Sequence, residues 1–151
     1  MANTQAMCTS FKAEILSGIH ALGTTVIRAG TGADTVKAAL YLASATVNDA
    51  TTAYSATGEV SGTGYTAGGV TATNATAPTS SGTTAYWTPS ASFTYTTVTL
   101  TTSFDCVLVY NSTQSNKSIS AHTFGAQTIT AGTFVLSMPT NDSTNALIRI
   151  A

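Results

Sequence analysis

The densest group of glycines in the chain lies in GEVSGTGYTAGG, residues 58 to 69, and its spacing makes phosphate binding a candidate chemistry. Glycine-rich loops bind phosphate when they join a strand to a helix N-terminus, where backbone N–H groups point at the anion. Gly62, Gly64 and Gly68 form G-x-G-x-x-x-G, one residue longer than the dinucleotide fingerprint. The following VTATNATAPTSSG is not a helical sequence, and no Lys-Ser or Lys-Thr directly follows the glycines. The stretch therefore favours a tightly turning structural loop.

The sequence contains no local pattern of residues that indicates acid–base catalysis, metal binding or a catalytic nucleophile. Catalysis by carboxylates usually needs two of them, and the acidic residues are scattered singly: Glu14, Asp34, Asp49, Glu59, Asp105 and Asp142. His20 and His122 stand apart from any Cys or carboxylate pattern typical of a metal site. Ser61 comes one position too late in GEVSG for a G-x-S-x-G nucleophile elbow. The many serines leave a Ser–His–Asp set assembled by the fold open, but we expect no catalytic residue, metal or cofactor.

Aromatic side chains could instead supply a stacking surface for sugars or bases. The candidates are Tyr41, Tyr54, Tyr65, Tyr86, Trp87 and Tyr95. Stacking of nucleic acid normally comes with basic residues, and the chain has only 5 Lys and Arg and a net charge of -1. Carbohydrate binding by an adhesin stays open as an alternative, and it requires an exposed Trp87 with tyrosines in a groove. Packing in the core or at a subunit interface is the commoner use of such residues.

The elements that would hold these residues follow a period of two over most of the chain. Strands are predicted at residues 24–29, 35–44, 93–100, 104–110, 117–123, 127–130, 133–138 and 146–150. Ala131-Gly132 predicts a tight hairpin between two of them. Cys106, within FDCVLVY, is expected to be a small buried core residue. Short strands with turn signals about every ten residues are typical of an antiparallel β-sandwich or barrel.

Two regions depart from this pattern. Residues Phe11 to Leu22, with Ser10 and Gly23 as caps, space their apolar side chains for one short helix. Residues 48–89 contain no long periodic stretch and are rich in Gly, Thr, Ala and Ser. Loops of this length inside a compact domain usually serve function or contact a partner. We therefore expect one mainly β domain over residues 1–151, with an N-terminal helix and a long Gly/Thr-rich loop region.

Composition narrows the class of protein. Charged residues make up 7% of the chain, against about 25% in typical soluble proteins. Without a basic patch, nucleic acid is not an expected partner, and no apolar run approaches the ~20 residues of a membrane span. No secretory signal pattern is visible, so Cys8 and Cys106 are expected to be reduced. Whether these two cysteines meet is left open.

Three stretches together resemble a family of small virion structural proteins of tailed bacteriophages: TTAYSATGEVSGTGYTAGGV, FDCVLVYN and ITAGTFVLSMPTNDSTNALIRIA. The similarity covers nearly the whole chain, from MANTQAMCTSFKAEIL to the last residue. The resemblance implies a β-rich capsid decoration, or cement, protein, often a homotrimer, that locks neighbouring major capsid proteins together. It implies no catalytic residue, synthesis in the host bacterial cytoplasm and a place on the virion surface. A neck, tail or fibre component is the alternative.

On this interpretation, the region of residues 48–89 is the expected contact surface. Its position and aromatic content predict five interface residues: Tyr54, Glu59, Tyr65, Tyr86 and Trp87. The glycines of residues 58–69 are expected to fold the connection back on itself and to place Glu59 and Tyr65 against a neighbour. Neutral, hydroxyl-rich faces suit such contacts, because they avoid the desolvation cost of buried charge.

Overall fold

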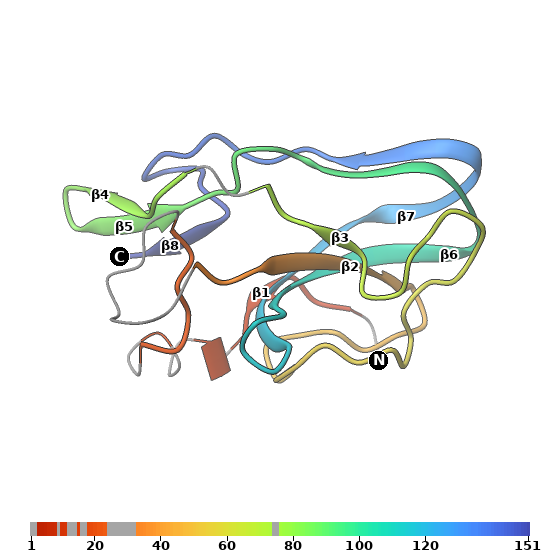
Figure 1. The fold of residues 1–151 in the computed structure, drawn as a ribbon, viewed down its shortest axis with the longest axis horizontal. Coiled ribbons are helices and arrows are strands. Elements are labelled where there is room, and N and C mark those ends of the chain that lie inside the picture. Colours follow the sequence, from red (N-terminus) through yellow and green to blue (C-terminus); the bar gives the residue numbers. More distant parts are fainter. Residues whose placement is uncertain (1–2, 9, 12–14, 16–17, 24–32, 74–75) are drawn as a thin grey trace.

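The computed structural model describes residues 3–8, 10–11, 15, 18–23, 33–73 and 76–151. Within these residues the chain forms two antiparallel sheets (Figure 1). The strands are β1 Ala6–Met7, β2 Val36–Leu42, β3 Val70–Thr71, β4 Thr79–Ser81, β5 Thr84–Trp87, β6 Phe93–Asn111, β7 Lys117–Leu136 and β8 Ile148–Ile150. The larger sheet has the order β1-β7-β6-β2-β3, and the smaller sheet has the order β4-β5-β8. The prediction of a mainly β, antiparallel fold is confirmed.

A long ribbon of two strands, β6 paired with β7, is the frame of the larger sheet. The ribbon curves back, so that its half containing residues 93–100 and 129–136 lies over the half that pairs with β2 (Figure 1). The register shifts between Leu100 and Phe104 and again between Phe104 and Cys106, where the ribbon turns. Such irregularities bend and twist a strand, because the residues opposite one another no longer match one to one.

The separate strands predicted along this ribbon are continuous in the structure. Residues 93–100 and 104–110 belong to the single strand β6. The segments predicted at residues 117–123, 127–130 and 133–138 merge into β7, which ends at Leu136, and the segment predicted at residues 146–150 contains β8. The hairpin predicted at Ala131-Gly132 is wrong, because both residues lie inside β7 and Gly132 is opposite Val98. Ala131 has a φ of 47° at a register shift. A bulge and a tight turn both use positive φ, so local sequence does not separate them.

The core lies between the two halves of the ribbon. Phe104 and Phe134 face each other there with ring centroids 5.3 Å apart. In β6, residues 106–110 are buried on both faces, and the Tyr54 ring covers one of them by stacking on Tyr110 at 4.8 Å. Cys106 is a buried free cysteine, as predicted, and Cys8 is likewise buried and free.

The N-terminal helix differs from its prediction. Residues 12–14, 16–17 and the predicted strand at residues 24–29 lie outside the described residues. Ser10, Phe11 and Ile15 have helical backbone, whereas residues 19–22 do not, so the predicted extension of the helix to Leu22 is wrong. Gly18 has a φ of 66°, and its N–H bonds the carbonyl of Ile15 at 2.9 Å. Glycine at positive φ is common directly after a helix, whereas Gly23, the predicted C-cap, does not follow helical residues.

The region of residues 48–89 is more ordered than the predicted long loop, because it contains β3, β4 and β5. Its irregular part is tied to three different strands by single antiparallel bridges: Tyr41 with Glu59, Ala53 with Lys117 and Thr63 with Thr99. This part therefore packs along the larger sheet and does not project from it. No described helix is long and apolar enough to cross a membrane.

Candidate functional site

Three of the five predicted interface residues meet in one hydrogen-bonded group, which we name the Glu59 cluster: Tyr54, Glu59, Tyr65 and Gly68. The Tyr54 hydroxyl donates to Oε2 of Glu59 at 2.6 Å. The Tyr65 hydroxyl and the Gly68 N–H both donate to Oε1 at 2.7 Å. Such short distances are typical of hydrogen bonds to an ionised carboxylate. One carboxylate thus joins Tyr54 to two points within the glycine-rich segment of residues 58–69.

The Glu59 cluster is attached to the central strands of the larger sheet. The Tyr65 hydroxyl accepts a hydrogen bond from the Leu40 N–H of β2 at 3.0 Å. The Tyr110 hydroxyl of β6 donates to the Gly68 carbonyl at 2.9 Å. Burial raises the pKa of Tyr110 to about 12, and it raises the pKa of Tyr65 further, with the hydrogen bond to Glu59 as a second cause. These hydroxyls therefore stay protonated at neutral pH.

Two glycines allow the glycine-rich segment of residues 58–69 to lie close to the backbone of β2 and β6. Gly69 has a φ of 70°, and a Cβ there would overlap the carbonyl oxygen of Ala38 in β2. Gly64 has a φ of 78°, and a Cβ there would overlap the carbonyl oxygen of Thr97 in β6. Glycine is needed because backbone meets backbone at a positive φ. The glycines fold the segment onto the larger sheet, and this brings Glu59 and Tyr65 toward each other.

The other two predicted interface residues lie in β5 of the smaller sheet, apart from the Glu59 cluster. Trp87 is 1% exposed, and its indole Nε1 donates to the Thr76 carbonyl at 3.1 Å. Tyr86 is half-buried and pairs with Arg149 across the strands. Both line an apolar pocket of about 180 Å³. A tryptophan this buried does not provide the exposed stacking surface that carbohydrate binding required.

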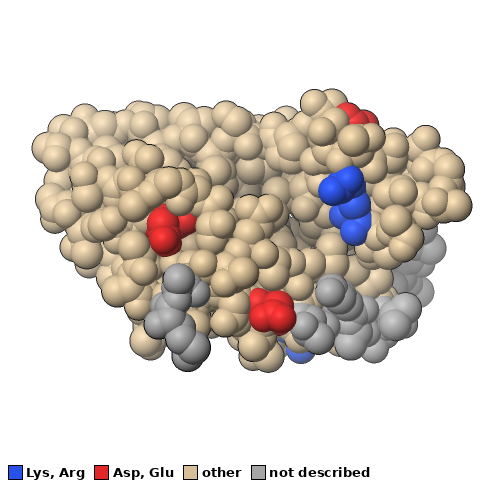
Figure 2. All heavy atoms as spheres, turned by 180° about the vertical axis from the view of Figure 1, so that it is seen from behind, with Lys and Arg blue, Asp and Glu red and all other residues tan. Residues whose placement is uncertain are grey.

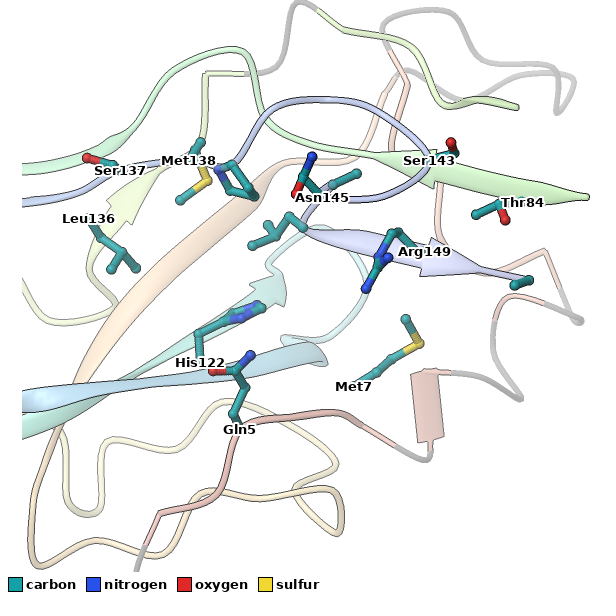
Figure 3. Close-up of a pocket in the computed structure, with 14 residues that line it drawn as sticks. Gln5, Met7, Thr84, His122, Leu136, Ser137, Met138, Ser143, Asn145 and Arg149 are labelled. Carbon is teal, nitrogen blue, oxygen red and sulfur yellow. The ribbon is translucent and has the colours of Figure 1, made fainter. Parts of the chain in front are cut away.

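A larger pocket of about 660 Å³, which we name the inter-sheet pocket, lies between the two sheets (Figure 3). Arg149 of β8 and Asn145 of the preceding connection line one side, and His122 of β7 and Met7 of β1 line the other. Figure 3 shows the Arg149, His122 and Met7 side chains extending into the space between these elements. Sequence reasoning missed this pocket, because its lining comes from segments that lie far apart along the chain and form no local motif.

The charge in the inter-sheet pocket is concentrated on Arg149. Burial lowers the pKa of His122 to about 4, so its imidazole is neutral at pH 7. Asp142, close to the pocket, has a pKa lowered by hydrogen bonds from the Asn145 side chain and from the N–H groups of Thr144 and Asn145, with Arg149 a smaller cause. Among the described residues, none forms a hydrogen bond or salt bridge with the Arg149 guanidinium. The Asp142 carboxylate is close enough to Arg149 to interact with it electrostatically.

The geometry also bears on nucleophilic chemistry and on metal binding. Ser120 Oγ lies 2.9 Å from His122 Nε2, which is the distance of a nucleophile from its base. Ser120 is only 2% exposed, and burial is the cause of the lowered pKa of His122, with no carboxylate contributing. The hydroxyl therefore does not face the pocket as a nucleophile would. Within the described ranges, no group of three or more His, Cys, Asp or Glu side chains is placed to hold a metal ion.

Comparisons with known proteins assign no family to the chain. A scan against protein families, a search of curated proteins and a search of solved structures found no match. Function is therefore inferred from the residues and the geometry of the chain itself.

Proposed function

We propose that this protein is a non-enzymatic capsid decoration, or cement, protein. In this proposal a β-sandwich-like subunit binds the outer capsid of a tailed bacteriophage and stabilises contacts between major capsid proteins. The chain is made in the host cytoplasm, associates as a homotrimer and is located on the virion surface. The resemblance of its sequence to small virion structural proteins supports this class of function.

The observation that carries the proposal is an exposed, uncharged surface held rigidly from within, which we name the Gly/Thr surface. It consists of residues 61–64 and 66–67, which are Ser, Gly, Thr, Gly, Thr and Ala, all exposed. Directly beneath them, Glu59 and Tyr65 bind each other at 2.7 Å. A surface ordered before binding loses little conformational entropy when a partner covers it. The Glu59 cluster thus supports the contact surface, and its own members need not touch the partner.

Low surface charge supports the same role. On the face drawn in Figure 2, acidic and basic side chains are few and form no continuous charged patch. Hydroxyl and backbone groups can form hydrogen bonds with a partner without removing ions from water, which costs several kcal/mol per ion. Many such contacts repeated over a shell add up, because binding to the assembled state stabilises it by mass action.

The test is the number of copies of this chain in purified particles of the phage that encodes it. Quantitative mass spectrometry should give a copy number comparable to that of the major capsid protein. Particles that lack the chain should also release their DNA at a lower temperature than complete particles. A count of about a dozen or fewer per particle would instead assign the chain to the neck, tail or fibre, whose symmetry allows only few copies.

A further inference from the structure

The inter-sheet pocket lies where two sheets end. Among the described strands, β1 lies at one edge of the larger sheet and β8 lies at one edge of the smaller sheet. Each contributes a lining residue, Met7 from β1 and Arg149 from β8. An edge strand carries unpaired backbone N–H and C=O groups, which are a template for pairing with another strand. Extended peptides bind proteins by adding to such edges.

The side chains of the pocket suit an extended segment whose residues alternate in character. Met7, Leu136 and Met138 provide apolar contacts. Arg149, which lies across the pocket from Met7, provides N–H donors. Successive side chains of a strand point to opposite sides, so one segment can fill both kinds of contact. A volume of about 660 Å³ falls within the roughly 300–1,000 Å³ of ligand pockets.

The charges of the residues that line the pocket indicate which kind of peptide segment it can bind. Arg149 is the one formally charged side chain among the described lining residues, since His122 is neutral at pH 7. The nearby Asp142 carboxylate is already bound by Asn145, whose side chain donates to both oxygens at 3.1 and 2.9 Å. The guanidinium fork matches a carboxylate in geometry and charge, and such pairs form strong hydrogen bonds.

We propose that the inter-sheet pocket binds an extended, acidic segment of the capsid protein that this chain decorates. Arg149 pairs with an Asp or Glu side chain of that segment, and the edges of β1 and β8 contact its main chain. This inference rests on the proposed function and adds to it the chemistry of the partner.

The first experiment measures the binding of purified protein to capsids that lack it, with wild type and three variants. Arg149→Glu reverses the pocket charge and should weaken binding by at least about tenfold, since a bidentate pair is lost and two like charges meet. Arg149→Lys keeps the positive charge but lacks the two-pronged guanidinium group, so its binding should be weaker than that of wild type and stronger than that of Arg149→Glu. Lys117→Glu, the matched control, makes the same change of charge in β7 away from the pocket lining, and it should bind like wild type.

The outcomes separate this inference from the proposed function. If wild-type protein does not bind the capsids, the decoration role fails. If wild type binds and Arg149→Glu binds equally well, the acidic-segment inference alone fails. Thermal unfolding of each variant identifies one that has lost its fold, and Arg149→Gln then replaces Arg149→Glu, with weaker binding again expected and unchanged binding again contradicting the inference.

A second experiment identifies the occupant. A photo-crosslinking amino acid replaces Ser143, which lines the pocket, and the protein is irradiated on decorated capsids. The adduct should map to a capsid-protein segment that contains Asp or Glu. An adduct with a second copy of this chain, with a segment lacking acidic residues, or no adduct at all would overturn the inference.

Discussion

Replacing Glu59 with alanine is expected to destabilise the protein by about 3 to 5 kcal/mol, a large share of the roughly 5–15 kcal/mol that holds a domain folded. The carboxylate accepts three hydrogen bonds, from the Tyr54 and Tyr65 hydroxyls and from the Gly68 N–H. Hydrogen bonds to a charged group contribute about 1.5–3 kcal/mol each. Their sum overstates the loss, because the half-buried Tyr54 hydroxyl regains water once its partner is removed.

Glu59→Gln should cost less, about 1 to 2 kcal/mol, because its amide oxygen still accepts hydrogen bonds while one charge-assisted bond is lost. Urea denaturation measures both values, with the single tryptophan as the probe. Trp87 is 1% exposed when folded, so its fluorescence should report unfolding. The slope of free energy against urea should be unchanged while the midpoint falls.

Asp49→Ala is the matched control, since it removes an exposed carboxylate and should shift stability by less than about 0.5 kcal/mol. Tyr54→Phe and Tyr65→Phe each remove one donor to Glu59. Tyr65→Phe should cost more of the two, because its hydroxyl also accepts from the Leu40 N–H. Our account of the Glu59 cluster fails if Glu59→Ala is as stable as Asp49→Ala.

Three other predictions concern single residues. Gly69→Ala should destabilise the protein far more than Gly82→Ala in thermal unfolding, because both glycines have positive φ but only a Cβ at residue 69 meets backbone, that of Ala38; equal losses would refute the steric argument. Because His122 is neutral in the folded protein with a pKa near 4 against an ordinary value of 6.5, stability should be complete above pH 6.5 and fall by about 3 kcal/mol toward pH 4. His122→Gln should remove this part of the pH dependence, and an unchanged profile would contradict it. Cys106, buried and with a pKa raised to about 12, should react with iodoacetamide at pH 8 only after denaturant is added; rapid labelling of the folded protein would count against its burial.

Local sequence predicted the longer strands of the larger sheet, but it missed the short strands β1, β3, β4 and β5. The alternation in VKAALYL predicted β2, because side chains of a strand point alternately to the two faces of its sheet. It was a poor guide to where strands end. Ala131 and Gly132 were predicted to form a turn. In the structure they lie in β7, where pairing with the neighbouring strand β6 makes them part of a bulge.

The candidate site divides in the same way. The proximity of Tyr54, Glu59 and Tyr65 in space could be predicted, because they are close in sequence. Glu59 is the one charged residue in this stretch, so it is the natural partner for the two hydroxyls. Whether these side chains point into the protein or outward could not be predicted, because it depends on how closely the Gly69 backbone approaches β2.

The sequence by itself determined the period of the strands, the scarcity of charge and the position of the glycines, since each is a property of neighbouring residues. Only the tertiary structure decided that Glu59 turns inward and that Arg149 lies across from Met7 in one pocket. Contacts between residues far apart along the chain depend on sheet order and on the curvature of the β6–β7 ribbon, and local periodicity carries no information about either.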